Sequence, residues 1–315
     1  MTVSLPEEVT AALKKYQGDA DEIIKAFRDK LDARRVSDTI YHYTDDRGLA
    51  GILGTGKLWL TDIFNLNDPS ELRHGFGKAV EAWRGKECAE AERVAAVLER
   101  VNRDPGFREW GHHFTCSFSS DGEELGQWRA YADNGQGYAL GFNRKELETG
   151  FIENGDSPFG QTFQVTYDDS ELTNLQSQIA ERTLDLTDFI AEKNLSDHEN
   201  KAFRVELFTW VTVYSLNAAL FFKHKAYRNE QEYRFLEMFP ADTKPGGVKV
   251  RTRPYSLVRY REFDWRTIAS TALREIVVGP AANREKGRQF ANDCLRANLV
   301  TNVNIVQSQI PYRVA

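Results

Sequence analysis

Apolar residues recur at helical spacing at the start of the chain and then occur in short runs typical of strands. Residues 7–35 place apolar positions between charged ones, which predicts an amphipathic helix. Residues 39–43 and 58–64 each predict a strand. Between these strands, apolar residues at i, i+3 and i+4 spacing predict a short helix that follows Asp45, a favoured N-cap residue, and ends at a nearby glycine. The chain therefore begins as helix, strand, short helix and strand.

Helical and strand patterns continue to alternate over the rest of the chain. Residues 171–224 predict two helices broken near residues 194–197, the second of them apolar on most sides and deeply packed. Further predicted helices cover residues 79–103, 124–132 and 283–298, and further predicted strands cover residues 113–119, 138–142, 230–238, 275–278 and 302–310. The pattern predicts an α+β (mixed α/β) protein. Residues 1–36 are expected to form an N-terminal helical extension, and residues 37–315 a single domain with a helical insertion at about 171–224.

Composition places the chain among globular proteins. Hydrophobic residues make up 41% of the 315 residues and aromatic residues 12%, which is enough for a packed core with ring-lined pockets. The formal net charge of −6 does not favour strong sequence-independent binding of nucleic acid, although it is compatible with a local basic patch.

Cysteine use and the N-terminal residues favour a cytoplasmic protein. The three cysteines, Cys88, Cys116 and Cys294, are odd in number and far apart, so they form no disulfide framework and no zinc-binding pair. The first ten residues show no basic and apolar signal-peptide pattern. Because no run of about 18 apolar residues occurs, we expect no membrane-spanning helix and no membrane partner.

Glu230 and Glu232 are the first candidate catalytic residues. If they lie two apart on one strand, their carboxylates face the same side, about 6.5–7 Å apart. One carboxylate could then brace a ribose hydroxyl and stabilise an oxocarbenium-like state, while the other orients a nucleophile. The alternative is an edge strand with a solvated charged face, on which Arg228 and Arg234 balance the glutamates.

Polar and aromatic side chains on two predicted strands could bind a nucleotide. His42 could hydrogen-bond a ribose hydroxyl, and Tyr43 could stack on a base; the alternative is a satisfied core histidine beside a packed tyrosine. Ser117 and Ser119 alternate on one strand, so their hydroxyls face the same side and could line a site or pair with a neighbouring strand.

A third group lies near the short helix at residues 124–132. Trp128, Arg129 and Tyr131 precede a Gly-x-Gly turn, which could let the backbone approach a flat or phosphorylated ligand. Ordinary turn chemistry is the alternative explanation of the glycines.

We predict no metal site from the sequence. His112, His113 and Cys116 lie close together, but they follow no standard ligand spacing. A cysteine–histidine nucleophile built on Cys116 stays open as an alternative.

A set of short strings occurs in order along roughly residues 39–312. The strings are Tyr41-His42-Tyr43-Thr44, Gly51-Ile52-Leu53, Asn67-Asp68-Pro69-Ser70-Glu71, Cys116-Ser117-Phe118-Ser119, Trp128-Arg129-Ala130-Tyr131, Gly137-Tyr138, Lys223-His224, Glu230-Gln231-Glu232-Tyr233-Arg234 and Glu275-Ile276-Val277-Val278-Gly279-Pro280. Taken together, they resemble one bacterial family, the domain of unknown function (DUF) 2971.

A weaker resemblance links the order of elements to the ADP-ribosyltransferase fold, with two small split sheets and helical insertions. His42 and Thr44 resemble the His-x-Thr pair that holds the NAD ribose, and Ser117-Phe118-Ser119 is similar to the Ser-x-Ser strand. Glu230-x-Glu232 resembles the Glu-x-Glu pair, which implies Glu232 as the catalytic carboxylate and Glu230 as its helper.

The same resemblance implies the other members of an NAD site. Tyr43, Tyr131 or Tyr138 is expected to stack on nicotinamide, and Arg73, Arg129 or Arg234 to neutralise the pyrophosphate. The full set of implied cofactor-binding residues is His42, Tyr43, Thr44, Asn67, Ser117, Ser119, Trp128, Arg129, Tyr131 and Arg234.

The leading functional hypothesis is an ADP-ribosyltransferase-like enzyme that consumes NAD as substrate and modifies a protein or nucleic acid acceptor. Its expected setting is a bacterial toxin or anti-phage defence system, with a partner protein of that system. The second hypothesis is a non-catalytic nucleotide-binding sensor or interaction module of a defence or stress system. The third is a metal-dependent or cysteine-based hydrolase that acts on nucleic acid.

Overall fold

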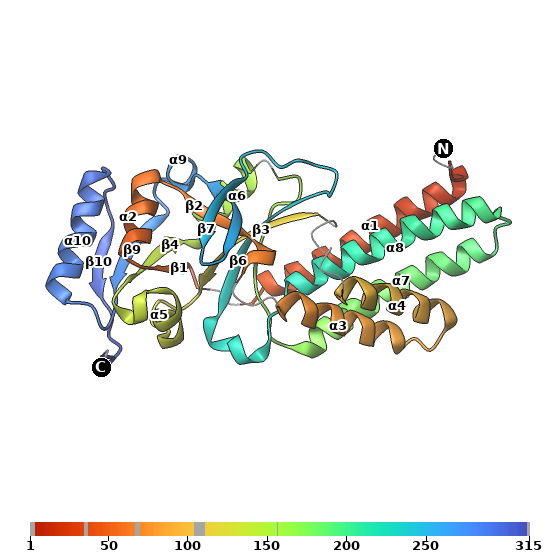
Figure 1. Ribbon diagram of the computed structural model, residues 1–315, viewed down its shortest axis with the longest axis horizontal. Helices are drawn as coiled ribbons and strands as arrows, with labels where there is room; N and C mark the ends of the chain where they lie inside the picture. The colour runs from red at the N-terminus through yellow and green to blue at the C-terminus, as the bar shows by residue number, and fades with distance from the viewer. Residues whose placement is uncertain (1–3, 35–36, 67–69, 104–110, 156, 314–315) are drawn as a thin grey trace. The chain divides into compact units, whose positions relative to one another are not determined.

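Contacts between residues divide the chain into two compact units. A computed structural model describes residues 4–34, 37–66, 70–103, 111–155 and 157–313 (Figure 1). The helical unit comprises Met1–Arg34, Asp68–Trp110 and Thr166–Lys225. The sheet unit comprises Arg35–Asn67, Gly111–Val165 and Ala226–Ala315.

The helical unit packs long helices from three separate stretches of the chain. Helix α3 contacts α4, α7 and α8, and α1 packs on α7 and α8. Their bounds are α1 (Glu7–Asp32), α3 (Ser70–Arg84), α4 (Ala89–Arg103), α7 (Asp169–Ala191) and α8 (Asp197–Leu220). The apolar stripe of α1 is buried, as its amphipathic pattern predicts. The N-terminal helix and the helical stretch after residue 165 therefore lie in one unit.

The described strands of the sheet unit form one branched sheet. Its strands are β1 (Thr39–Thr44), β2 (Leu58–Asp62), β3 (His112–Ser119), β4 (Tyr138–Asn143), β5 (Gln161–Gln164), β6 (Glu232–Phe239), β7 (Lys249–Arg253), β8 (Ser256–Phe263), β9 (Leu273–Val278) and β10 (Asn304–Gln307). Along the sheet the order is β10-β9-β4-β1-β3-β2-β8-β7, with β6 paired to β3 and β5 to β6. Only β9 and β10 pair in parallel among these ladders.

Strand β3 is the branch point of the sheet. Its whole length, from His112 to Ser119, pairs with β6 along one edge. Its other edge is shared, because Ser119 pairs with Tyr41 of β1 while Thr115 pairs with Thr61 of β2. The two arms of the sheet therefore meet on β3.

Helices cover the two faces of this sheet unequally. Helices α2 (Asp46–Thr55), α6 (Arg144–Asn154), α9 (Trp265–Ile268) and α10 (Arg284–Ala297) contribute to the main apolar cluster, on what we call the core face. Helix α5 (Leu125–Tyr131) places Trp128 in a second cluster with Tyr43, on the opposite face, which we call the α5 face.

The mixed α+β class predicted from the sequence is confirmed, including the N-terminal helix. Local start and stop signals are also confirmed at α2, where the Asp45 carboxylate accepts a hydrogen bond from Gly48 N at 2.7 Å. Gly56 ends this helix in the left-handed conformation, with φ of 70°. Within the described ranges, no helix combines the length and apolarity needed to cross a membrane.

Candidate functional site

Four of the predicted site residues face the same side of the β3–β6 ladder. Ser117 lies opposite Arg234 in this antiparallel pair, and Ser119 lies opposite Glu232. Directly opposed residues and residues two apart on a strand share one face of a sheet. Because Tyr41 pairs with Ser119, this face is the α5 face. The predicted common orientation of the two serine hydroxyls therefore holds in the structure.

Glu232 is the centre of a compact polar cluster, which we call the Glu232 cluster. Ser117 Oγ donates a hydrogen bond to Glu232 Oε1 at 2.6 Å. Arg234 donates to the same oxygen from Nε at 2.9 Å and from Nη2 at 2.8 Å. Glu232 and Arg234 are only 3% and 2% exposed, whereas Ser117 is exposed. The cluster is thus a buried ion pair to which the exposed Ser117 hydroxyl is bonded.

Such a buried pair is sensitive to the loss of either partner. Removing one member of a buried ion pair leaves an uncompensated charge and typically costs about 3–5 kcal/mol. Ser119 contributes differently, because its buried hydroxyl accepts a hydrogen bond from Asp121 N at 3.1 Å and shapes the turn after β3.

The expectation that Glu230 shares a strand with Glu232 is wrong. Glu230 is the last residue of the 3₁₀ helix η4 (Lys225–Glu230), and β6 begins at Glu232. Between them Gln231 adopts a φ of 44°, in the left-handed region, so the alternation of a strand does not extend to Glu230. The alternative of a solvated edge strand is also wrong, since β6 lies between β3 and β5 and is buried throughout.

His42 lies on the core face rather than beside the Glu232 carboxylate. The preceding residue, Tyr41, pairs with Ser119 and lies on the same face of the sheet. Because side chains alternate along a strand, His42 points to the opposite face. Its ring packs on Phe118 with centroids 5.7 Å apart, and its Nδ1 donates to Ser117 O at 3.2 Å. Burial lowers the pKa of His42, as expected of a neutral, satisfied histidine.

The histidine also contacts Cys116, the nucleophile of the cysteine-based alternative. Cys116 Sγ lies 4.0 Å from His42 Nδ1. Burial raises the pKa of the Cys116 thiol to about 12, which opposes the thiolate that nucleophilic attack requires. Among the residues that the structure describes, no group of three His, Cys, Asp or Glu side chains is placed to hold a metal ion.

Tyr43 and Trp128 pack against each other on the α5 face. Their rings meet edge to face with centroids 4.9 Å apart, and Trp128 is fully buried. The Tyr43 hydroxyl donates to Asp121 O at 2.8 Å, and burial raises the pKa of Tyr43. Both rings belong to the second apolar cluster. For Tyr43 this agrees with the alternative of a packed tyrosine.

The other predicted ligand-binding residues are distributed around this region. Thr44 ends β1 and is half-buried, whereas Arg129 and Tyr131 are exposed on α5. Tyr138 is buried and donates to Gly287 O at 3.3 Å. Arg73 lies in α3 of the helical unit. The predicted residue Asn67, like Asp68 and Pro69 of the same string, lies outside the described residues.

The family comparison bears on this arrangement. Residues 127–235 match the family model described as "Protein of unknown function (DUF2971)". The resemblance to DUF2971 is thereby confirmed, and the matched segment runs from α5 into β6. No curated protein and no solved structure matches the chain. The similarity to the ADP-ribosyltransferase fold stays a prediction.

The DUF2971 segment contains both Glu232 and Arg234, while Ser117 precedes it. It also contains the Gly-x-Gly turn, whose glycines have a structural cause. Gly135 has a φ of 85°, and a Cβ on Gly137 would lie 2.2 Å from Thr44 O. The backbone is therefore crowded here by β1 itself, in agreement with the ordinary-turn explanation.

Tyr41 is a polar contact of the α5 face that sequence reasoning missed. Its hydroxyl donates to Glu275 Oε1 at 2.7 Å, and burial together with Glu275 raises the pKa of Tyr41. The signal was present in the alternation of β1, because Tyr41 and Tyr43 are two residues apart and must share a face.

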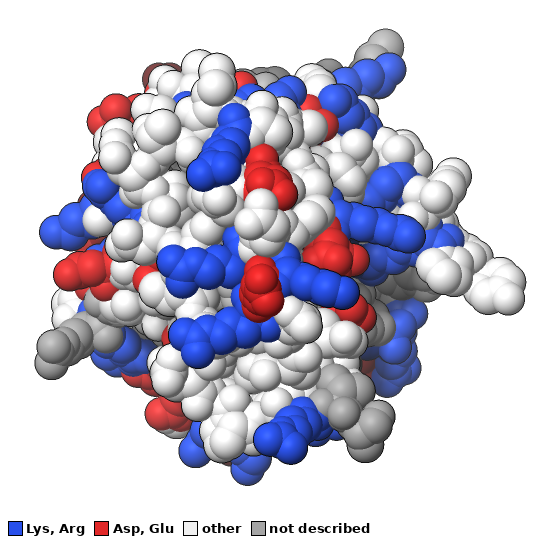
Figure 2. Space-filling model, turned by 90° about the vertical axis from the view of Figure 1, so that its left-hand side faces the viewer, with Lys and Arg blue, Asp and Glu red and all other residues white. Residues whose placement is uncertain are grey.

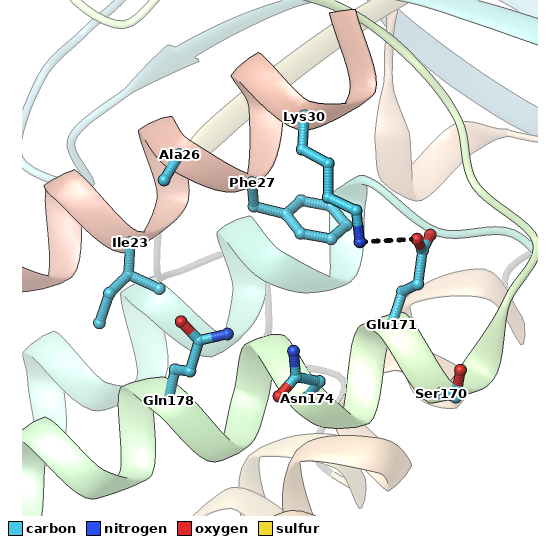
Figure 3. A pocket seen from close by; sticks show the side chains of 8 residues that line it. All are labelled: Ile23, Ala26, Phe27, Lys30, Ser170, Glu171, Asn174 and Gln178. Atoms are coloured by element: carbon cyan, nitrogen blue, oxygen red, sulfur yellow. Dashed lines mark hydrogen bonds and ion pairs between the residues drawn. The ribbon is translucent and has the colours of Figure 1, made fainter. Parts of the chain in front are cut away.

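Each unit also has an open pocket. In the helical unit a pocket of about 370 Å³ lies between α1 and α7 (Figure 3). It is walled by Ile23 and Phe27 and closed at one end by a Lys30–Glu171 ion pair of 3.1 Å. In the sheet unit a pocket of about 760 Å³ is lined by residues of α10 and by Tyr138. Among the predicted site residues that the structure describes, Tyr138 lines the pocket of the sheet unit and the others line neither pocket.

Proposed function

We propose that this chain is an NAD-dependent ADP-ribosyltransferase-like enzyme in which Glu232 is the catalytic carboxylate. The observation that carries the proposal is the Glu232 cluster. Ser117 and Arg234 both bond to one oxygen of the carboxylate, which fixes its orientation. Catalysis by electrostatic stabilisation requires such a group, held in place before the substrate arrives.

The main requirement of the proposed reaction is a negative charge held in a fixed position. In the proposed reaction the bond between nicotinamide and ribose breaks, and nicotinamide leaves with the bonding electrons. A carboxylate beside the ribose stabilises the oxocarbenium-like state, and the acceptor then bonds to the anomeric carbon and gives up its proton. Ser117 is the exposed member of the cluster, so a ribose hydroxyl could take its place as a donor to Glu232.

The proposal does not depend on His42 or Glu230. The His42 ring packs on Phe118 on the core face, and Glu230 belongs to a 3₁₀ turn ahead of β6. Their roles in ribose binding and acceptor positioning stay predictions from the family resemblance.

The decisive test measures nicotinamide release from NAD by mass spectrometry, with bacterial lysate as a source of acceptors. We expect release by the wild type and loss of it in Glu232→Gln, which removes the charge and keeps the shape. Glu237→Gln is the matched control, because Glu237 is a buried carboxylate of the same strand, paired with Arg261 at 2.5 Å. Equal release by wild type and Glu232→Gln would overturn the assignment of Glu232.

A second candidate is a non-catalytic nucleotide-binding module of a bacterial defence or stress system. The burial of Glu232, at 3% exposure, favours it, since a closed ion pair also suits a purely structural role. Under this proposal the folded wild type releases no nicotinamide with any acceptor. It still binds NAD or another nucleotide in a calorimetric titration.

A further inference from the structure

Exposed Trp59 and buried Tyr260 form an aromatic pair on the arm of the sheet formed by β2, β7 and β8. Trp59 of β2 is 44% exposed, and its ring lies 4.6 Å from that of Tyr260, tilted by 37°. Its strand neighbours Leu58 and Leu60 point into the main apolar cluster, so alternation turns Trp59 outward. Part of the Trp59 ring is therefore accessible on this face of the arm.

Cationic side chains of β7 line the same face. Lys249 pairs with Tyr260 and Arg251 with Val258, so Lys249, Arg251 and Arg253 all lie on the side that carries the two rings. The Arg251 guanidinium lies 5.1 Å from the centroid of the Trp59 ring, within the range of a cation–π contact. The rings and the charges thus form one continuous surface.

The charge of this surface is positive. Its carboxylate, Glu262, bonds both Lys57 and Lys249 at 2.9 Å and is neutralised by them. Arg251 is partly buried and close to Arg253, and burial together with this like charge lowers the pKa of Arg251. A bound anion would relieve the repulsion between the two arginines.

Protection of a sheet edge does not explain this combination. Lys and Arg on an edge strand such as β7 discourage pairing with other chains, but an exposed tryptophan does not. The surface around α10 in Figure 2 offers a contrast, because cationic and anionic side chains are interspersed there. On the β2–β7–β8 surface the cations of β7 instead share one face of the sheet with Trp59 and Tyr260.

We propose that the outer face of β2, β7 and β8 binds single-stranded nucleic acid. A base stacks on Trp59, and Lys249, Arg251 and Arg253 contact the phosphates on either side of it. Stacking requires an unpaired base, which excludes the interior of a duplex, and Arg suits phosphate through its planar fork of donors. The inference is independent of the proposed enzymatic function, because it requires no chemistry at Glu232.

The test is fluorescence anisotropy with short labelled oligothymidylate, oligouridylate and a mixed-sequence duplex. We expect both single strands to bind more tightly than the duplex. With about three phosphate contacts, affinity should fall roughly tenfold to thirtyfold between about 50 and about 200 mM salt. Trp59→Ala should weaken binding about tenfold, the value of one stacked base, and Trp59→Phe should restore most of it.

Matched variants separate this surface from general charge effects. Arg251→Ala should weaken binding, whereas Arg288→Ala, an exposed arginine of α10, should not. Unchanged affinity in Trp59→Ala, with circular dichroism and melting temperature like those of the wild type, would overturn the proposal. So would tighter binding of the duplex, or no binding of any oligonucleotide at low salt. A difference between the two single strands reports the combined effect of the sugar and of the thymine methyl group, and it supports the proposal in either direction.

Discussion

Strand β6 carries two buried glutamates, each paired with an arginine, and the two ion pairs differ in the groups that lie next to them. Glu237 accepts a hydrogen bond from Arg261 Nε at 2.5 Å, and the guanidinium lies 4.9 Å from the centroid of the Phe239 ring. Glu232 pairs with Arg234 of its own strand and also accepts from exposed Ser117. One pair is covered by an aromatic ring, and the other has a hydroxyl at the surface.

The difference between the pairs shows why a buried charge alone does not identify a site. Both glutamates are nearly inaccessible, at 3% for Glu232 and 4% for Glu237. The Glu232 cluster has an exposed polar partner, Ser117, that a ligand could replace without first entering the core. The exposed serine, rather than the buried carboxylate, is therefore the feature that marks the candidate site.

The largest effect is expected from breaking the covered pair. Glu237→Ala leaves Arg261 buried without its carboxylate and should lower the free energy of unfolding by about 3–5 kcal/mol. Glu232→Ala should cost at least about 1 kcal/mol less, because water can enter beside Ser117 and solvate Arg234. Urea denaturation measures both, with the exposed Glu153→Ala of α6 as control. Equal losses in the two variants would remove the distinction drawn between the pairs.

A second prediction concerns pH and His113, which lies on β3 opposite Met238, the residue that follows Glu237. Burial lowers the pKa of His113 from 6.5 to about 4. Between pH 6.5 and pH 4 the His113 side chain is protonated in the unfolded chain but neutral in the folded chain. Its contribution to stability is therefore present above pH 6.5 and is lost as pH falls towards 4. The loss from this residue should reach at most about 3 kcal/mol.

Urea denaturation at several pH values tests this sign. The apolar variant His113→Leu should show a shallower fall in unfolding free energy between pH 6.5 and 4 than the wild type. An unchanged slope in the variant would assign the acid sensitivity to other groups.

The smallest effect is the coupling between Ser117 and Glu232. Ser117→Ala removes one hydrogen bond at an exposed position and should cost about 1 kcal/mol. In a double-mutant cycle with Glu232→Gln the two changes should be coupled by about 1 kcal/mol. The same serine change combined with Glu237→Gln should be additive within about 0.5 kcal/mol. Coupling to Glu237 as strong as that to Glu232 would contradict the separation of the two pairs.

Short-range sequence signals predicted several local features of this structure. The cap at Asp45, the end of α2 and the shared orientation of Ser117 and Ser119 all follow from short-range rules, which the structure confirms. Those features depend only on residues within a few positions of one another.

Features that depend on distant parts of the chain were not predictable in this way. Gln231 takes a left-handed conformation that its own side chain does not favour, so the turn that separates Glu230 from Glu232 gave no signal. The placement of His42 on the core face depends on the register of Tyr41 with Ser119, 78 positions further along the chain (119 − 41). Strand pairing across such separations leaves no trace in local periodicity.

The branch point at β3 also has a consequence for how the protein folds. The partners of β3 come from Tyr41, from Thr61 and from the segment that begins at Glu232. Such pairings close long loops, which slows folding because the entropy of closure is lost before the contacts form. During synthesis, β3 leaves the ribosome long before β6 exists, so its second edge has no partner until more than a hundred further residues have followed. The Glu232 cluster is therefore completed only when that late pairing forms.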